Sequence, residues 1–107
     1  MTTTQEKIIN QLKALETLSM QGGYSDTLAL SLKKILIQEI NVIHLQIKEL
    51  ETDIKAFEQQ YQLSSEPFYQ QFKAGQLGDA VDFVEWSAFY QMWSSLQGRL
   101  ILLQSQL

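Results

Sequence analysis

The chain has 107 residues, with 12 acidic and 8 basic side chains and a formal net charge of −4. This length fits a single domain, and an apolar share of 45% excludes a disordered chain. The absence of cysteine excludes a disulfide, a thiolate zinc site and a thiol nucleophile.

Charge and targeting patterns narrow the class of partner. Lys33 and Lys34 form the only adjacent basic pair, and Arg99 is the single arginine. Because nucleic-acid binding depends on clustered Lys and Arg, we expect no direct nucleic-acid role and favour a basic protein partner. The first residues lack a basic segment followed by an apolar run, and no apolar stretch approaches the roughly 18 residues that span a bilayer. We therefore expect a cytoplasmic protein without a membrane segment.

Pro67 and five glycines divide the chain into about four helical pieces, and no stretch alternates as a strand would. The first helix is predicted from about Thr4 to Met20, with a narrow apolar face. Thr3 or Thr4 can cap its start, and Gly22 or Gly23 can end it in a left-handed conformation.

The second helix is predicted to be long, with Ser25 or Asp26 as its cap. Its apolar residues are spaced alternately by four and three, which is an unbroken heptad pattern: Leu36, Ile40, Ile43, Ile47, Leu50, Ile54, Phe57 and Tyr61. A second apolar set on the same helix consists of Leu32, Ile35, Val42 and Leu45. A helix that is apolar on two sides needs two neighbours. The first helix can be one neighbour and a second subunit the other. Together with a length of about 50 Å at 1.5 Å per residue, this predicts a homodimer through the 26–61 helix.

A short third helix follows, with Ser64 or Ser65 as its cap, Pro67 in its first turn and Gly75 at its end. The last helix is predicted to begin near Asp82 and to reach the C-terminus. It carries a second heptad pattern: Trp86, Phe89, Trp93, Leu96, Leu100, Leu103 and Leu107. The predicted fold is all-α: one domain over residues 1–107, a long antiparallel helical hairpin with an N-terminal helix and a short corner helix, as in a three-to-four-helix bundle.

The corner from Gly75 to Trp86 combines glycines, carboxylates and aromatic residues. Asp82 and Glu85 have the spacing of a capping box, and Val81 and Trp86 stand at the positions of a hydrophobic staple. Capping alone can therefore explain the carboxylates.

An alternative is a magnesium-dependent helical hydrolase, in which paired carboxylates on two helices hold the ion. Asp82 and Glu85 would provide one pair, and Glu49 and Asp53 a second. This set is incomplete, and the lone His44 lacks the partners of a catalytic triad. We therefore expect no catalytic residues, no metal and no cofactor.

The segment from Phe57 to Trp93 resembles a family of small helical prokaryotic proteins. Its "FEQQY", "SEPFYQQFKAGQLGD" and "DFVEWSAFY" are similar to the family patterns F-E-x-K-Y, S-x-x-F-Y-x-x-F-x-x-G-E-L-G-D and D-F-x-E-W-x-x-L-Y. Two positions depart from the patterns: Gln60 replaces a frequent basic residue, and Gln76 replaces the usual Glu. The resemblance covers about a third of the chain and implies an antitoxin-type partner of a small, basic, ribonuclease-like toxin, of the TumE–TumA kind.

The first hypothesis is thus a non-enzymatic, antitoxin-like binding module that covers the active surface of a basic partner. Candidate partner-binding residues are four polar groups and one supporting aromatic residue: Asp79, Asp82, Glu85, Tyr90 and Trp86. The second hypothesis is a structural coiled-coil dimer or adaptor, in which the corner is only a bend.

Overall fold

The structure is a computed structural model that describes residues 3–107. All four elements in this range are helices, which confirms the all-α class. The contacts divide the chain into two compact units, Met1–Ile35 and Leu36–Leu107, with the boundary inside a continuous helix. A single domain over residues 1–107 therefore stays a prediction.

The first unit contains α1 (Thr4–Met20) and the start of α2 (Asp26–Tyr61). Thr3 and Glu6 form a capping box: the Thr3 hydroxyl accepts from the Glu6 amide at 3.1 Å, and the Glu6 carboxylate accepts from the Thr3 amide. Gly22 follows the helix with a φ of +75°, the left-handed conformation that glycine adopts most easily. The predicted start and end of this helix are confirmed.

The second unit is built on α2, whose start is capped by Ser25: its hydroxyl accepts from the Leu28 amide at 3.1 Å. Five positions of the predicted heptad pattern are buried along one side of the helix, namely Ile40, Ile43, Ile47, Leu50 and Ile54. The apolar side chains of Val42 and Leu45, from the second predicted set, are exposed.

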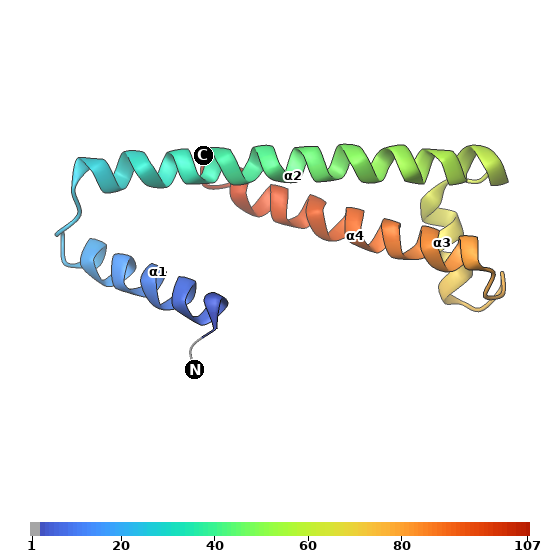
Figure 1. The fold of residues 1–107 in the computed structure, drawn as a ribbon, viewed down its shortest axis with the longest axis horizontal. Helices are drawn as coiled ribbons and strands as arrows, with labels where there is room; N and C mark the ends of the chain where they lie inside the picture. Colours follow the sequence, from blue (N-terminus) through green and yellow to red (C-terminus); the bar gives the residue numbers. More distant parts are fainter. Residues whose placement is uncertain (1–2) are drawn as a thin grey trace. The chain divides into compact units, whose positions relative to one another are not determined.

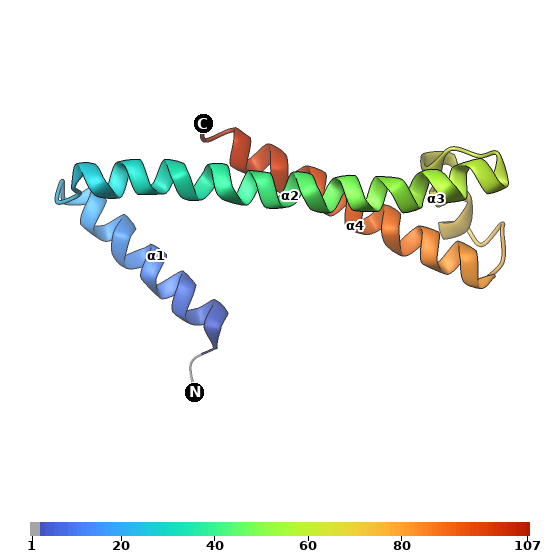
Figure 2. The same ribbon diagram turned by 45° about the horizontal axis from the view of Figure 1, so that its top comes forward.

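The helix α4 (Val81–Gln104) returns alongside α2 in the opposite direction. The short α3 (Ser65–Lys73) lies at the closed end of this hairpin, between the end of α2 and the start of α4 (Figures 1 and 2). Leu96 and Leu100 of α4 join the buried residues of α2 in one core, and three further side chains of α4 pack against it: Phe89, Trp93 and Leu103. The predicted antiparallel hairpin with a corner helix is confirmed.

The predicted start of α4 near Asp82 is confirmed, but three other predictions about this helix are wrong. The helix begins at Val81 after Ala80, which offers no side-chain cap, and Asp82 lies inside the first turn and bonds to α2 instead. Val81 is 80% exposed while Trp86 is fully buried, so the predicted staple is absent as well. At its other end α4 stops at Gln104, and Leu107 is exposed outside the core.

Candidate binding surface

Trp86 lies at the centre of an aromatic cluster that fastens α3 to the hairpin. Its indole is fully buried and lies almost parallel to the ring of Phe68, with centroids 3.7 Å apart. Phe57 and Tyr61 of α2 stack near the same indole, at 5.8 and 6.0 Å. Aromatic side chains bury large areas, so these contacts fix the position of all three helices at this end.

A chain of hydrogen bonds runs out of this cluster. The indole Nε1 of Trp86 donates to the Ser65 hydroxyl at 2.9 Å, and that hydroxyl donates to Oε2 of Glu58 at 2.8 Å. The Ser65 amide donates to the same carboxylate oxygen, also at 2.8 Å. Ser65 was predicted as a possible cap of α3; the structure places Ser64 at the N-cap, without a side-chain hydrogen bond, and buries Ser65 as the link between Glu58 and Trp86.

A second polar contact ties the end of α2 to the start of α4. The Tyr61 hydroxyl donates to Oδ2 of Asp82 at 2.5 Å, and the Gln60 amide reaches the same oxygen at 3.5 Å. The hydrogen bond to Asp82 raises the pKa of Tyr61 above its ordinary value, with desolvation and the negative charge of Asp82 as smaller causes. Both hydrogen bonds end on Oδ2 of Asp82, which is partly exposed, so a partner contact of Asp82 stays a prediction.

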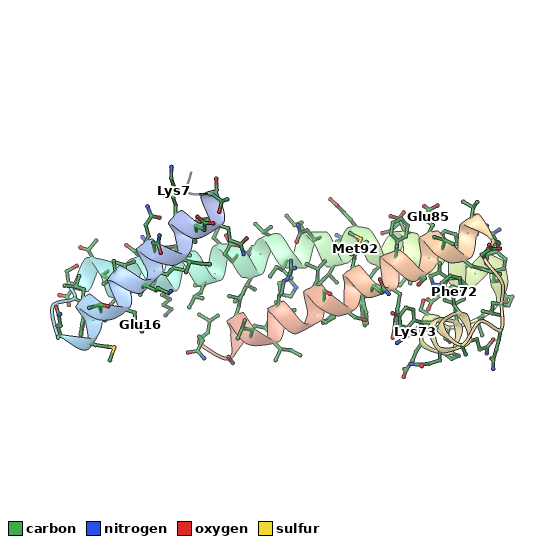
Figure 3. All side chains as sticks on the ribbon, turned by 90° about the horizontal axis from the view of Figure 1, so that it is seen from below. Lys7, Glu16, Phe72, Lys73, Glu85 and Met92 are labelled. Carbon is green, nitrogen blue, oxygen red and sulfur yellow. The ribbon has the colours of Figure 1, made fainter. Side chains whose placement is uncertain are left out.

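The remaining predicted site residues separate onto different sides of the hairpin end. Asp79 is exposed in the segment between α3 and α4, and Glu85 is exposed on α4. Glu85 and Met92 lie on the same side of α4 (Figure 3). Tyr90 follows Glu85 by five residues, about 140° around the helix, and packs against Tyr69 with centroids 5.0 Å apart.

Two of the grooves are lined by more than one helix of the hairpin. The Arg99 groove, of about 630 Å³, is lined by both long helices, with the polar residues Gln46, Glu49, Asp53, Gln91, Ser95 and Arg99. The α3 groove, of about 300 Å³, lies where α3 begins. Its charged and aromatic lining consists of Glu51, Lys55, Glu58, Glu66, Tyr90 and Trp93.

The net negative charge of the protein is concentrated at the closed end of the hairpin. Residues 56–98 contain five acidic side chains and one basic side chain, a net charge of −4. The rest of the chain holds seven acidic and seven basic side chains and is neutral overall. The acidic residues of residues 56–98 are Glu58, Glu66, Asp79, Asp82 and Glu85. A positive surface would be attracted to this end in particular.

The acidic pairs considered for magnesium are used differently. Asp82 bonds to Tyr61, whereas Glu49 and Asp53 line the Arg99 groove. Within residues 3–107, no three His, Asp or Glu side chains stand close enough to hold a metal ion together. His44 is exposed on α2. In the same range, no helix has the combination of length and apolar character needed to cross a lipid bilayer.

Comparisons of the chain with protein-family models, with curated proteins and with solved structures gave no match.

Proposed function

We propose that this protein is a non-enzymatic binding module that covers a basic protein partner with the closed end of its hairpin. The observation that carries the proposal is the concentration of the whole net charge of −4 in residues 56–98. These residues also hold the aromatic cluster around Trp86, which keeps the surrounding carboxylates on a rigid support. A fixed negative surface speeds the encounter with a positive one and disfavours acidic partners.

The resemblance of Phe57 to Trp93 to antitoxin-type proteins supports a specific form of this proposal. The partner would be a small, basic, ribonuclease-like protein, neutralised because its active surface is covered. Asp79, Glu85 and Tyr90 are the proposed contact residues, since each is at least partly exposed. Asp82 and Trp86 support them from within the fold.

Co-expression tests this function. The tagged chain is produced together with the product of the adjacent reading frame, and a stable complex is expected to co-purify. The double change Asp79→Asn and Glu85→Gln removes two charges from the closed end and should weaken the complex. The matched control, Glu16→Gln with Glu39→Gln, removes two charges from the neutral remainder of the chain and should not. Absence of a complex, or equal weakening by both double variants, would contradict the proposal.

A structural homodimer through the 26–61 helix is our second proposal. Ile35 and Val42 stand seven residues apart on α2, and both side chains remain exposed, at 54% and 44%. An apolar stripe with this spacing is typical of a helix that pairs with another. Val42→Lys should shift the sedimenting species from dimer to monomer. Asn41→Lys, an equal change of charge at an exposed position about 100° around the helix from Val42, should leave a dimer. A parent chain that sediments as a monomer would contradict this proposal.

A further inference from the structure

The α3 groove is small. Its volume of about 300 Å³ stands at the lower end of ligand-binding pockets, which hold roughly 300–1,000 Å³. Helices α2, α3 and α4 all contribute to it, and all belong to the unit Leu36–Leu107. The aromatic cluster holds these helices together, so the shape of the groove is set by the fold.

The groove is acidic, and one of its carboxylates is fixed in place. Glu51, Glu58 and Glu66 line it against a single cation, Lys55. Glu58 is half-buried and accepts both hydrogen bonds from Ser65 through Oε2, so these two bonds do not engage its other oxygen, Oε1. A carboxylate that is already oriented loses little side-chain entropy when it meets a cation.

Two aromatic rings complete the groove. Tyr90 and Trp93 both line it and stack on one another, with centroids 5.8 Å apart and ring planes 19° from parallel. The faces of such rings attract cations, and tryptophan does so most strongly. The indole Nε1 of Trp93 is buried and makes no hydrogen bond to any of residues 3–107. A guanidinium has no acceptor for this donor, so the contribution of Trp93 to the groove is the face of its ring.

This lining matches one side chain best. The guanidinium of arginine is planar, stacks on aromatic rings and pairs with carboxylates in a two-pronged geometry, whereas the lysine ammonium is a compact and strongly hydrated charge. The Arg99 groove offers a contrast within the same hairpin, because there Glu49 and Asp53 share the lining with the guanidinium of Arg99. The α3 groove has no arginine in its lining.

We propose that the α3 groove binds an arginine side chain of the basic protein partner, between its carboxylates and the rings of Tyr90 and Trp93. This inference rests on the proposed function for the source of the arginine. The groove itself recognises the guanidinium, so its chemistry can be tested without the partner.

The probe is the peptide acetyl-Gly-Arg-Gly-amide, with acetyl-Gly-citrulline-Gly-amide as its neutral counterpart of nearly equal shape. Both are titrated into the full chain labelled with ¹⁵N. The chain has two tryptophans, so the indole N–H region holds two signals, which Trp93→Phe assigns. The arginine peptide should move the Trp93 signal and leave that of the fully buried Trp86 in place, and the citrulline peptide should move neither.

Charge variants then locate the site. Glu51→Gln and Glu66→Gln should each weaken the binding of the arginine peptide by about threefold, as expected for partly exposed ion pairs. Glu49→Gln, the same change in the Arg99 groove, should leave it unchanged. A Trp93 signal that does not move, that moves equally with citrulline, or that responds to Glu49→Gln as strongly as to Glu66→Gln would overturn the inference.

The two proposals fail separately. If a partner co-purifies but the arginine peptide leaves Trp93 unaffected, the groove has been misassigned and the binding function stands. If the peptide binds as described but no partner co-purifies, the groove recognises guanidinium groups and the proposed function is wrong.

Discussion

Phe68 lies face to face with Trp86, with ring centroids 3.7 Å apart and ring planes only 5° from parallel. Aromatic pairs in proteins usually keep their centroids about 4.5–7 Å apart and offset or tilted. Both side chains are fully buried. The contact joins the short α3 to α4 and makes Phe68 the main apolar anchor of the corner helix.

Phe68→Ala should therefore lower the free energy of unfolding by about 3–5 kcal/mol, the usual cost of deleting a buried phenylalanine. Phe72, one turn later on α3 and only half-buried, provides the matched control, and Phe72→Ala should cost clearly less. Urea denaturation followed by circular dichroism measures both values. Equal losses of unfolding free energy in the two variants would contradict the role of Phe68 as the main apolar anchor of α3.

Ser65→Ala should destabilise the protein by about 1–3 kcal/mol, because the buried indole N–H of Trp86 would lose its acceptor. The other buried serine, Ser87, serves as the control for loss of a hydroxyl, since the hydrogen bonds that join Glu58, Ser65 and Trp86 do not involve it. Ser87→Ala should lower the free energy of unfolding clearly less than Ser65→Ala. The reverse order of the two variants would contradict the role assigned to Ser65.

The bond between Tyr61 and Asp82 should appear as coupling in a double-mutant cycle. Tyr61→Phe and Asp82→Asn should each destabilise the protein, and the double variant should lose less than the sum, because each change already breaks the shared hydrogen bond. Strictly additive losses would contradict the contact. A capping role for Asp82 would instead leave its effect independent of Tyr61.

The same hydrogen bond should make the free energy of unfolding fall at alkaline pH. Since the hydrogen bond to Asp82 raises the pKa of Tyr61 in the folded state, its contribution is complete below the ordinary tyrosine pKa of about 10 and is lost as the pH rises through the raised value. The difference in unfolding free energy between the parent and Tyr61→Phe should therefore shrink in that alkaline range. The exposed Tyr24→Phe controls for removal of a phenol. A difference that stays constant would contradict the raised pKa.

Gly98→Ala should stabilise the protein by about 0.5–1 kcal/mol, because glycine costs that much inside a helix. A Cβ at this position would meet no atom within 4 Å, so no close helix contact within the described chain requires the glycine. Gly75→Ala is the opposing control. Gly75 has a φ of +74°, so alanine there should destabilise, by about 1–2 kcal/mol. Thermal unfolding of the two variants should move in opposite directions.

The periodic parts of the sequence predicted the fold well. The heptad pattern from Ile40 to Ile54 and the matching one through Leu96 and Leu100 meet in the core. Apolar residues at helical spacing lie on one face of a helix, and that face is buried whichever helix packs against it. The ends of α1 and the start of α2 were also predictable. Their caps, Thr3 and Ser25, bond to residues three positions along the chain.

The polar contacts of the candidate site could not be predicted in this way. Asp82 and Glu85 have capping-box spacing, yet Asp82 bonds to Tyr61, 21 residues earlier in the chain. Ser65 likewise links residues from two other helices, and its sequence context resembles an ordinary cap. Such pairings depend on the crossing of α2, α3 and α4, which no local spacing encodes. The sequence does show many aromatic residues around Ser65 and Asp82, and this pattern indicates where helices converge.

The position of α3 also bears on how the chain folds. Contacts at the closed end of the hairpin join residues 21 or 22 apart, as in Tyr61 with Asp82 and Tyr69 with Gln91, whereas the open end brings residues near 40 to residues near 100. Closing the shorter loop costs less chain entropy, so we expect the corner to form first and the long helices to pair progressively away from it. Changes at Phe68 will therefore slow folding, and changes at Leu100 will mainly speed unfolding. The corner helix is thus expected to influence the order of assembly, in addition to the binding role proposed for this end of the protein.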